Sequence, residues 1–312
     1  MIFDEVILDD MDEELNNEYL KELRLGDPKT LEKDVELRVL SLGAGVQSSY
    51  MLFKILEGEI KPPDIALFAD TGNEPKEVYE WLKYLETLMK GKIPFEVVRN
   101  NQNTGNIIED YKAQEGRYAL IPTHILKNDG TAGFGRRTCT FEYKIKPIQV
   151  KVREMLGVKT LRNRCVEMVM GISLDEIQRA KAPISKWQIS CYPLIENKIT
   201  RSDIKHWISH TDYGQPPRSA CIVCPYHNNK EWKNLKENYP EEFEEAVKFD
   251  EYLRDPNSKG VGINNFRKNE KGKTSEQYLY SKKIPLRIAT FDEPSDYQGT
   301  LFDDECEGMC GI

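Results

Sequence analysis

One stretch of the chain, residues 38–74, restricts the possible folds more than any other. An apolar run over residues 37–42 stops at Gly43-Ala44-Gly45, and apolar residues at helical spacing follow it. A second apolar run, residues 65–69, ends at Asp70. This pattern predicts a buried strand, a glycine turn, a helix and a second buried strand, as at the start of an α/β domain.

The glycine turn suggests a bound anion. Gly43 and Gly45 allow the backbone to approach a ligand closely, and free N–H groups at a helix start favour negative charge. Gln47, Ser48 and Ser49 follow the turn. Phosphate is the anion that most often fits such a turn. No Gly-Lys-Ser/Thr sequence follows, so the turn is not a Walker loop.

The alternation of strands and helices continues to about residue 210. Residues 75–89 have helical spacing, residues 95–98 form a short strand, and residues 169–173 form another strand that ends in a turn. This predicts an α/β fold with a doubly wound, mostly parallel sheet. Ligands bind such sheets at the carboxyl ends of the strands, where Gly43, Asp70 and Thr71 would lie.

Composition excludes several classes of protein. A chain of 312 residues with 39% hydrophobic residues can fill a core, and no apolar run is long enough to cross a bilayer. The acidic N-terminus lacks the basic residues of a signal peptide. The net charge of −8 argues against non-specific coating of nucleic acid. We therefore expect a soluble, cytoplasmic protein with no membrane association.

Three parts are expected along the chain. Residues 1–34 form an acidic N-terminal arm, with a weak amphipathic helix suggested by Leu15, Tyr19, Leu20 and Leu23. Residues 35–215 are expected to form the α/β domain that carries the glycine turn. Residues 216–312 form a helical region that contains cysteines, followed by a tail.

A polar, glycine-bearing loop is expected over residues 101–138. It ends in Arg136-Arg137-Thr138, and Cys139 comes next. Adjacent arginines suit a phosphate or sulfate oxyanion because each guanidinium can donate two hydrogen bonds. The helix expected over residues 142–156 brings Lys144 one turn beyond Cys139, and we expect Lys144 to face the site.

Seven cysteines, an odd number, suit metal binding or redox chemistry better than a disulfide framework. Cys221 and Cys224 have the C-x-x-C spacing that can chelate one metal or cluster, and His227 could be a further ligand. Such a pair supplies two ligands, so a site needs others from elsewhere. Cys165 and Cys191 are expected in the core.

The acidic C-terminal tail carries the last two cysteines, Cys306 and Cys310. Either could act as a nucleophile if a basic pocket received the tail, because acidic neighbours raise the pKa of a thiol. Alternatively, the two cysteines could complete a metal site or form a redox pair.

These motifs together resemble the PP-loop ATP pyrophosphatases, and within them the phosphoadenosine phosphosulfate (PAPS) reductase-like family of bacteria and phages. The resemblance extends from Arg38 to about Arg254. The usual aspartate of the family's first loop is Gln47 or Ser48 here. The motifs that carry the resemblance are Ser41-Leu-Gly43-Ala-Gly45-Val-Gln-Ser48-Ser49, Phe68-Ala-Asp70-Thr71-Gly72, Cys139 with Lys144-Ile-Lys-Pro147, Gly171 with Asp175-Glu176 and Arg179, Tyr192-Pro-Leu-Ile195, and Cys221 to His227.

The resemblance implies a PP-loop fold, like that of adenine nucleotide alpha hydrolases, that binds ATP or an adenylyl-sulfate nucleotide such as adenylylsulfate or PAPS. It also implies that Arg136, Arg137 and Lys144 counter phosphate or sulfate charge. Cys139 becomes the third metal ligand beside Cys221 and Cys224. The nucleotide contacts implied are Ser41, Gly43, Gly45, Gln47, Ser48, Ser49, Asp70, Thr71, Gly72, Gly171, Asp175 and Arg179.

Three metal states stay open: a 4Fe–4S cluster, zinc as the alternative, and free thiols. The first hypothesis for the reaction is sulfonucleotide reduction, with Cys306 or Cys310 as nucleophile and a thioredoxin-like reductant. The second is ATP-dependent sulfur insertion from a sulfur donor, with nucleic acid as a partner only in the role of acceptor. The third is a catalytically silent nucleotide-binding regulator. A homodimer is also considered.

Overall fold

A six-stranded, mostly parallel sheet forms the centre of the molecule. The computed structural model describes residues 19–101, 103–113, 119–127, 129–255, 258 and 275–292. The strands of the sheet are β1 (Leu23–Gly26), β2 (Leu37–Ser41), β3 (Ile65–Asp70), β4 (Phe95–Arg99), β7 (Val166–Met170) and β8 (Gln188–Tyr192). Their order is β1-β8-β7-β2-β3-β4, with β1 antiparallel to β8 and all other pairs parallel.

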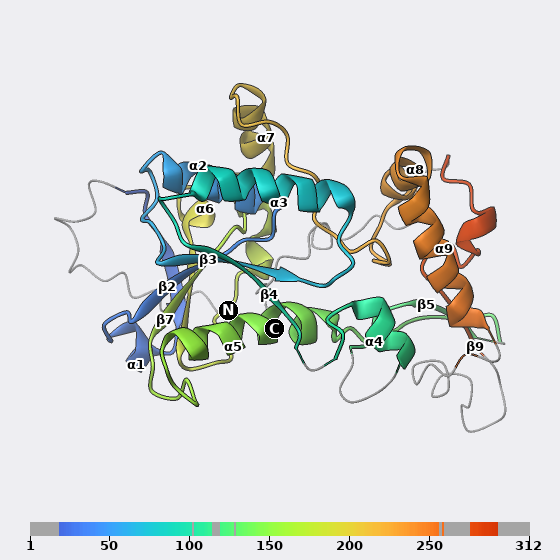
Figure 1. The fold of residues 1–312 in the computed structure, drawn as a ribbon, viewed down its shortest axis with the longest axis horizontal. Helices are drawn as coiled ribbons and strands as arrows, with labels where there is room; N and C mark the ends of the chain where they lie inside the picture. Colours follow the sequence, from blue (N-terminus) through green and yellow to red (C-terminus); the bar gives the residue numbers. More distant parts are fainter. Residues whose placement is uncertain are drawn as a thin grey trace.

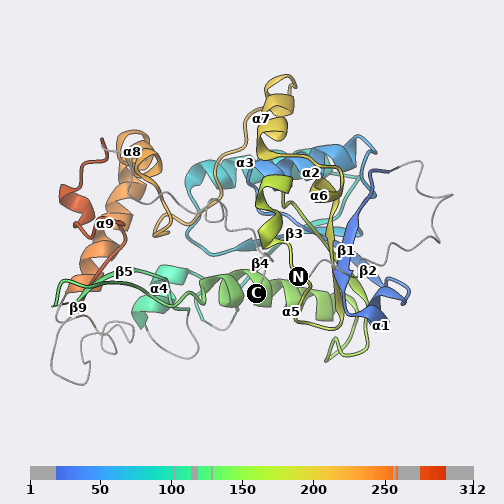
Figure 2. The same cartoon turned by 180° about the vertical axis from the view of Figure 1, so that it is seen from behind.

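Helices cover both faces of this sheet, which confirms the predicted α/β class. Figure 1 shows α2 and α3 on one side and α5 on the other, and Figure 2 shows the same layers from behind. No helix among the described residues combines the length and apolar character needed to cross a membrane. The helices are α1 (Pro28–Leu31), α2 (Val46–Leu56), α3 (Lys76–Met89), α4 (Ile107–Ala113), η2 (Thr140–Ile145), α5 (Lys146–Met155), η3 (Leu174–Arg179), α6 (Pro193–Glu196), α7 (Arg201–Ser209), α8 (Asn229–Asn238), α9 (Pro240–Arg254) and η4 (Leu286–Ile288).

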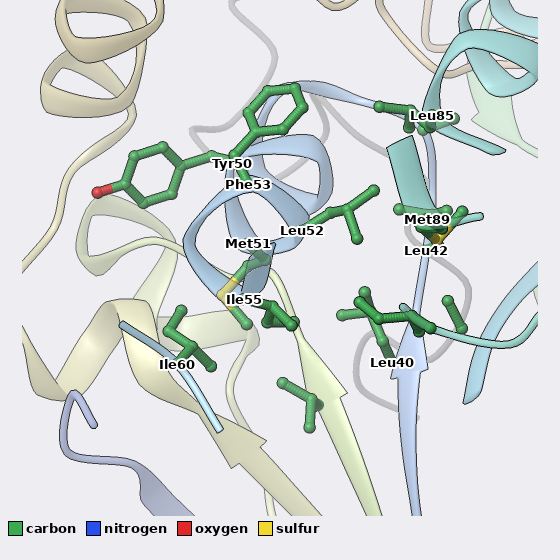
Figure 3. Close-up of a cluster of buried hydrophobic side chains, with 14 of the residues drawn as sticks. Leu40, Leu42, Tyr50, Met51, Leu52, Phe53, Ile55, Ile60, Leu85 and Met89 are labelled. Carbon is green, nitrogen blue, oxygen red and sulfur yellow. The ribbon is translucent and has the colours of Figure 1, made fainter. Parts of the chain in front are cut away.

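The central strands are apolar along their whole length because both faces of the sheet are buried. Successive side chains of a strand point to opposite faces. Leu40 therefore packs in the cluster that includes Met51 and Leu85, from α2 and α3 (Figure 3). Val39 packs in the opposite cluster with Ile148 of α5.

The strand order changes direction at β2. This strand pairs with β3 on one side and with β7 on the other. The chain moves outward through β3 and β4 and then returns to β7 and β8. Such a switch point leaves a crevice at the carboxyl ends of the two central strands, where ligands of this fold class bind. The loops that follow β2 and β7 meet there.

A second, smaller assembly adjoins the main sheet. Its antiparallel strands are β5 (His124–Lys127), β6 (Ala132–Phe134) and β9 (Ser275–Tyr278), in the order β6-β5-β9. They lie with α8 and α9 at one end of the molecule (Figure 1). The expected loop over residues 101–138 is wrong in part, because α4, β5 and β6 lie within it. These elements are short, and β5 pairs with β9, a strand far along the chain.

The start of the described chain also differs from expectation. Leu23, expected on a weak helix, lies in β1 opposite Tyr192; Leu15 lies outside the described residues. Buried Arg38 binds Glu167 at 2.7 Å and also bonds to Glu22, just before β1. This ion network fastens β1 and β7 to the centre of the sheet.

Candidate functional site

The turn after β2 contains a run of backbone donors. Ala44 has a φ of 58°, in the left-handed region, and Gly45 caps α2 with extended φ and ψ. Within the described residues, the N–H groups of residues 43–48 donate to no acceptor, although these residues are buried. Buried backbone donors are nearly always paired. The 43–48 turn therefore has the donor arrangement of an anion site, supported by the dipole of α2.

Gly171, directly after β7, presses against this turn. A Cβ at position 171 would lie 3.0 Å from both the carbonyl carbon of Gln47 and the nitrogen of Ser48. Both of these atoms belong to the backbone and cannot rotate away. The backbone that follows β7 and the first turn of α2 are thus in direct contact. The contact of Gly171 with a nucleotide, which the resemblance implies, stays a prediction.

The side chains of the turn brace it from behind. The Gln47 amide donates to Ser173 Oγ and to Glu176 Oε2, both at 2.8 Å. Trp81 Nε1 donates to Ser49 Oγ at 2.9 Å. These contacts use the Gln47 amide nitrogen and the Ser49 hydroxyl, while Gln47 Oε1 has no hydrogen-bond partner among the described residues. Ser41 and Ser48 are also buried.

Asp175 and Arg179, both predicted site residues, lie in the segment that follows β7. The Asp175 carboxylate accepts from the Arg201 N–H at 3.0 Å and so helps to hold the first turn of α7. Arg179 binds Glu176 Oε2 at 2.7 Å, and Glu176 in turn holds Gln47. In this structure both residues organise the segment that faces the 43–48 turn.

Asp70, at the end of β3, organises the next turn. Its Oδ1 accepts from the Gly72 N–H at 2.7 Å and from the Tyr79 hydroxyl at 2.8 Å, and its Oδ2 accepts from Arg99 Nε at 2.7 Å. Gly72 has a φ of +69°, and a Cβ there would lie 2.7 Å from the Gly105 carbonyl oxygen. The turn therefore requires glycine at position 72.

A cluster of four side chains follows this turn, three of them buried and the fourth, Cys221, half-buried; we call it the buried cluster. Cys221 Sγ lies 3.2 Å from Thr71 Oγ1 and 3.7 Å from Glu74 Oε1. Lys144 Nζ lies 3.8 Å from the same Glu74 oxygen, and the two side chains are 6% and 0% exposed. The cluster joins β3, the π-helical turn η2 and the C-x-x-C segment.

Sequence reasoning missed Glu74 in this cluster. Its signal was present, since a carboxylate stands three residues after Thr71 at the carboxyl edge of a buried strand. Among the described residues, Glu74 Oε2 has no hydrogen-bond partner. Lys144 lies beside this carboxylate, and its role toward a ligand stays a prediction.

The electrostatics of the cluster keep Cys221 protonated. Burial, and then the Glu74 carboxylate, raise the pKa of the Cys221 thiol well above its ordinary value, while Lys144 acts in the opposite direction. The pKa is raised, so the neutral thiol predominates near pH 7. A neutral thiol is a weak nucleophile.

The C-x-x-C segment is a compact turn. The Cys224 N–H donates to the Cys221 carbonyl at 2.9 Å, and His227 Nε2 lies 3.0 Å from that same carbonyl. Burial, and then the Arg218 guanidinium, lower the pKa of His227 to about 3. The imidazole is therefore neutral, and it uses Nε2 to close the turn.

The predicted metal ligands are brought to one region but do not form a metal site there. Cys139 packs on the hydrophobic cluster to which Ile222 and Val223, between the two cysteines of the pair, also belong. Across the described residues, no three or more His, Cys, Asp or Glu side chains are grouped so that they could hold a metal ion. These residues alone do not fit a cluster or a zinc ion. Cys306 and Cys310 lie outside the described residues, and the metal stays a prediction.

The arginine pair lies on the outer side of the C-x-x-C turn. Arg136 and Arg137 follow β6 and are exposed. The Arg137 guanidinium carbon lies 5.2 Å from the centre of the Tyr226 ring. The segment before Cys139 and the segment after Cys224 therefore touch. The convergence of the cysteines themselves stays a prediction.

Comparisons with known proteins add limited information. Neither a family model nor a curated protein matches the chain in sequence. A phosphoadenylyl-sulfate (PAPS) reductase from Candida auris, solved as a phosphate complex, is similar in structure with 14% identity and a TM-score of 0.35, over 57% of this chain and 73% of that chain. The U34-tRNA thiolase NcsA from Methanococcus maripaludis, solved with its [4Fe-4S] cluster, gives 16% identity and a TM-score of 0.33, over 70% and 73%.

The contact at Gly171 gives the first prediction. Gly171→Ala forces the backbone of β7 away from α2, and we expect a loss of about 1–3 kcal/mol in the free energy of unfolding, as for an overpacked core. Urea denaturation measures this loss. Gly133→Ala is the matched control, because its Cβ would lie at an ordinary 3.7 Å from Ile125 Cβ. Equal stability of the two variants would contradict the contact.

The buried cluster gives the second prediction, which concerns pH. Because Glu74 raises the pKa of Cys221, Glu74→Gln should lower it and speed alkylation of Cys221 between pH 7 and 9 by about tenfold per pKa unit. Lys144→Met should raise the pKa and slow the same reaction. Peptide mass spectrometry after iodoacetamide treatment reads each rate, with Cys165 as the internal control. A shift in the same direction for both variants would rule out this arrangement of charges.

Proposed function

We propose that this chain is an adenine-nucleotide-dependent enzyme of sulfur chemistry, of the PP-loop type, and that it reduces a sulfonucleotide. One observation carries the proposal: the buried N–H groups of residues 43–48 have no acceptor among the described residues and lie at the switch point of the sheet. A phosphate group would satisfy several of these donors at once. The resemblance of the first loop and of residues 68–72 to the PAPS reductase-like family adds the adenine nucleotide.

The residues divide into two roles in this proposal. The 43–48 turn, with Gly171 behind it, would hold the phosphates of the nucleotide. The buried cluster of Thr71, Glu74, Lys144 and Cys221 stands at the carboxyl end of the neighbouring strand β3. There the Lys144 ammonium would counter the charge of a sulfate group.

The tail thiols suit the role of nucleophile better than Cys221, which is half-buried and whose thiol is kept neutral. A thiolate of Cys306 or Cys310 would attack the sulfur of the sulfonucleotide. A sulfur–sulfur bond would form, the bond between sulfur and the phosphate oxygen would break, and the nucleoside phosphate would leave with the electron pair. A thioredoxin-like dithiol would then reduce the thiosulfonate, releasing sulfite and becoming a disulfide.

Nucleotide binding is tested at Ala44, whose φ of 58° is natural for glycine and closed to proline. ATP, adenylylsulfate and pyrophosphate should bind wild type and Ala44→Gly with similar affinity, and adenosine should not bind. Ala44→Pro should weaken binding at least about tenfold, because a charge-assisted hydrogen bond contributes ~1.5–3 kcal/mol. Isothermal titration calorimetry measures the affinities, and circular dichroism checks the fold. Full binding by Ala44→Pro would exclude the turn as the phosphate site.

The reaction is tested by sulfite release from adenylylsulfate and from PAPS in the presence of a dithiol. The double variant Cys306→Ser/Cys310→Ser should lose turnover while it keeps nucleotide binding. Cys165→Ala is the control, since Cys165 is buried beside Thr30 and has no role in the proposed site. Unchanged turnover in the double variant would remove the tail from the mechanism.

A second reaction, ATP-dependent sulfur insertion into a nucleic acid or nucleoside, is favoured by a different observation. An exposed aromatic and cationic surface at Phe134, Arg137 and Tyr226 borders both cysteine segments, where an acceptor could dock. In that case AMP or pyrophosphate should be released from ATP only when an acceptor is present. Sulfite release without any acceptor would favour reduction instead.

A further inference from the structure

The surface beside the cysteine segments is built from aromatic rings and arginines. The Phe134 ring lies 5.5 Å from the Tyr226 ring and 4.9 Å from the His124 ring, measured between centroids. Arg137 lies over Tyr226 at 5.2 Å. We call Phe134, Arg136, Arg137 and Tyr226 the hairpin patch. Phe134 lies in β6 of the β5–β6 hairpin, and the two arginines follow β6.

The hairpin patch is rigidly supported from below. His124, in β5, is buried, and its Nε2 lies 3.2 Å from the Pro225 carbonyl. Gly135 follows Phe134, and its N–H donates to the Thr123 carbonyl at 2.8 Å. A Cβ at position 135 would lie 2.9 Å from the Thr123 nitrogen, so the chain is held close at the point where Arg136 begins.

The upper side of the patch faces solvent. Phe134 is 44% exposed although the His124 and Tyr226 rings lie beside it, and both arginines are exposed. Burial, and then the nearby Lys283 ammonium, lower the pKa of His124, so a further cation stands close to the patch. An exposed ring beside guanidinium groups offers a stacking surface and phosphate contacts within one short segment.

We propose that the hairpin patch binds single-stranded nucleic acid, with a base stacked on Phe134 and the backbone phosphates on Arg136 and Arg137. Any unpaired base can stack on an exposed ring, whereas a base inside a duplex cannot reach it. In this proposal the arginines bind phosphates of a nucleic-acid strand. The sequence had suggested that they bind the phosphate or sulfate of a nucleotide. This goes beyond sulfonucleotide reduction and does not depend on the 43–48 turn.

The net charge of −8 opposes the binding of nucleic acid to most of the protein surface. Most of the surface repels a polyanion, so attraction must come from the patch alone. Binding should therefore be weak, sensitive to salt and lost when few residues are changed. Each phosphate contact with a single strand contributes about 0.7 to the slope of log affinity against log salt.

The test uses the full chain without nucleotide and a fluorescein-labelled, mixed-sequence single-stranded oligonucleotide of about twelve nucleotides. Fluorescence anisotropy at about 50–200 mM salt should give saturable binding to the wild type. Arg136→Ala/Arg137→Ala should weaken binding at least tenfold and lower the salt slope by about 1.4. Phe134→Leu should weaken it about five- to tenfold, because the ring is lost while an apolar side chain stays.

Matched controls separate the patch from general charge. Lys159→Ala/Arg162→Ala removes two exposed positive charges from the segment that follows α5, outside the hairpin patch, and should leave binding unchanged. The duplex form of the oligonucleotide should bind more weakly than the single strand. No binding by the wild type, or equal loss in both double variants, would overturn the proposal. Competition by an acidic peptide with the same dependence on Phe134 would also overturn it, because the patch would then be a protein-docking surface. Because no nucleotide is present, failure here leaves sulfonucleotide reduction intact and removes only the docking surface that favours sulfur insertion.

Discussion

The contact between Gly171 and the first turn of α2 fixes the geometry on which the site depends. With the Gly171 backbone directly against Gln47 and Ser48, β7 and α2 cannot shift relative to each other without opening the crevice. The switch in strand order places this contact at the carboxyl edge of the sheet. The turn thus presents its N–H groups from a rigid support, and a bound phosphate would cost little reorganisation.

The site combines two different kinds of electrostatics. The 43–48 turn offers partial positive charge from backbone dipoles, which does not change with pH. The cluster around Glu74 instead contains a carboxylate, an ammonium and a thiol in a buried space. Burial, and then the Glu74 carboxylate, raise the pKa of the Cys221 thiol, and the Lys144 ammonium opposes this effect. Phosphate binding and thiol chemistry can thus be altered separately, by backbone variants at the turn and by side-chain variants in the cluster.

The sequence predicted the central sheet well because its signals are local. Continuous apolar runs gave β2 and β3, and the glycine turn and its helix lie where the spacing placed them. Arg38 and Gly171 take their roles from contacts with residues more than a hundred positions away. The pairing of β5 with β9 was not predicted, because it too joins distant parts of the chain. Strands of four residues with polar flanks also leave little local signal in the sequence.

The candidate site was predicted in part. The turn residues, Gly171 and Lys144 were named from pattern and resemblance, and the structure places them at the crevice and the buried cluster. Glu74 was missed because a lone carboxylate after a strand is common and gives no sign of its burial. The expected contact of Asp70 with the ligand stays a prediction; in the structure its oxygens accept hydrogen bonds from Gly72, Tyr79 and Arg99. No sequence pattern distinguishes an aspartate that binds a ligand from one that shapes a turn.

The central claim is that the backbone of residues 43–48 binds phosphate. Amide chemical shifts of ¹⁵N-labelled protein, titrated with pyrophosphate and then with ATP, test this most directly. The account predicts large, saturable chemical-shift changes for the amides of residues 43–48 with both ligands. The amides in the last turn of α2 should show small changes. Saturable binding that leaves the amides of residues 43–48 unmoved would contradict it.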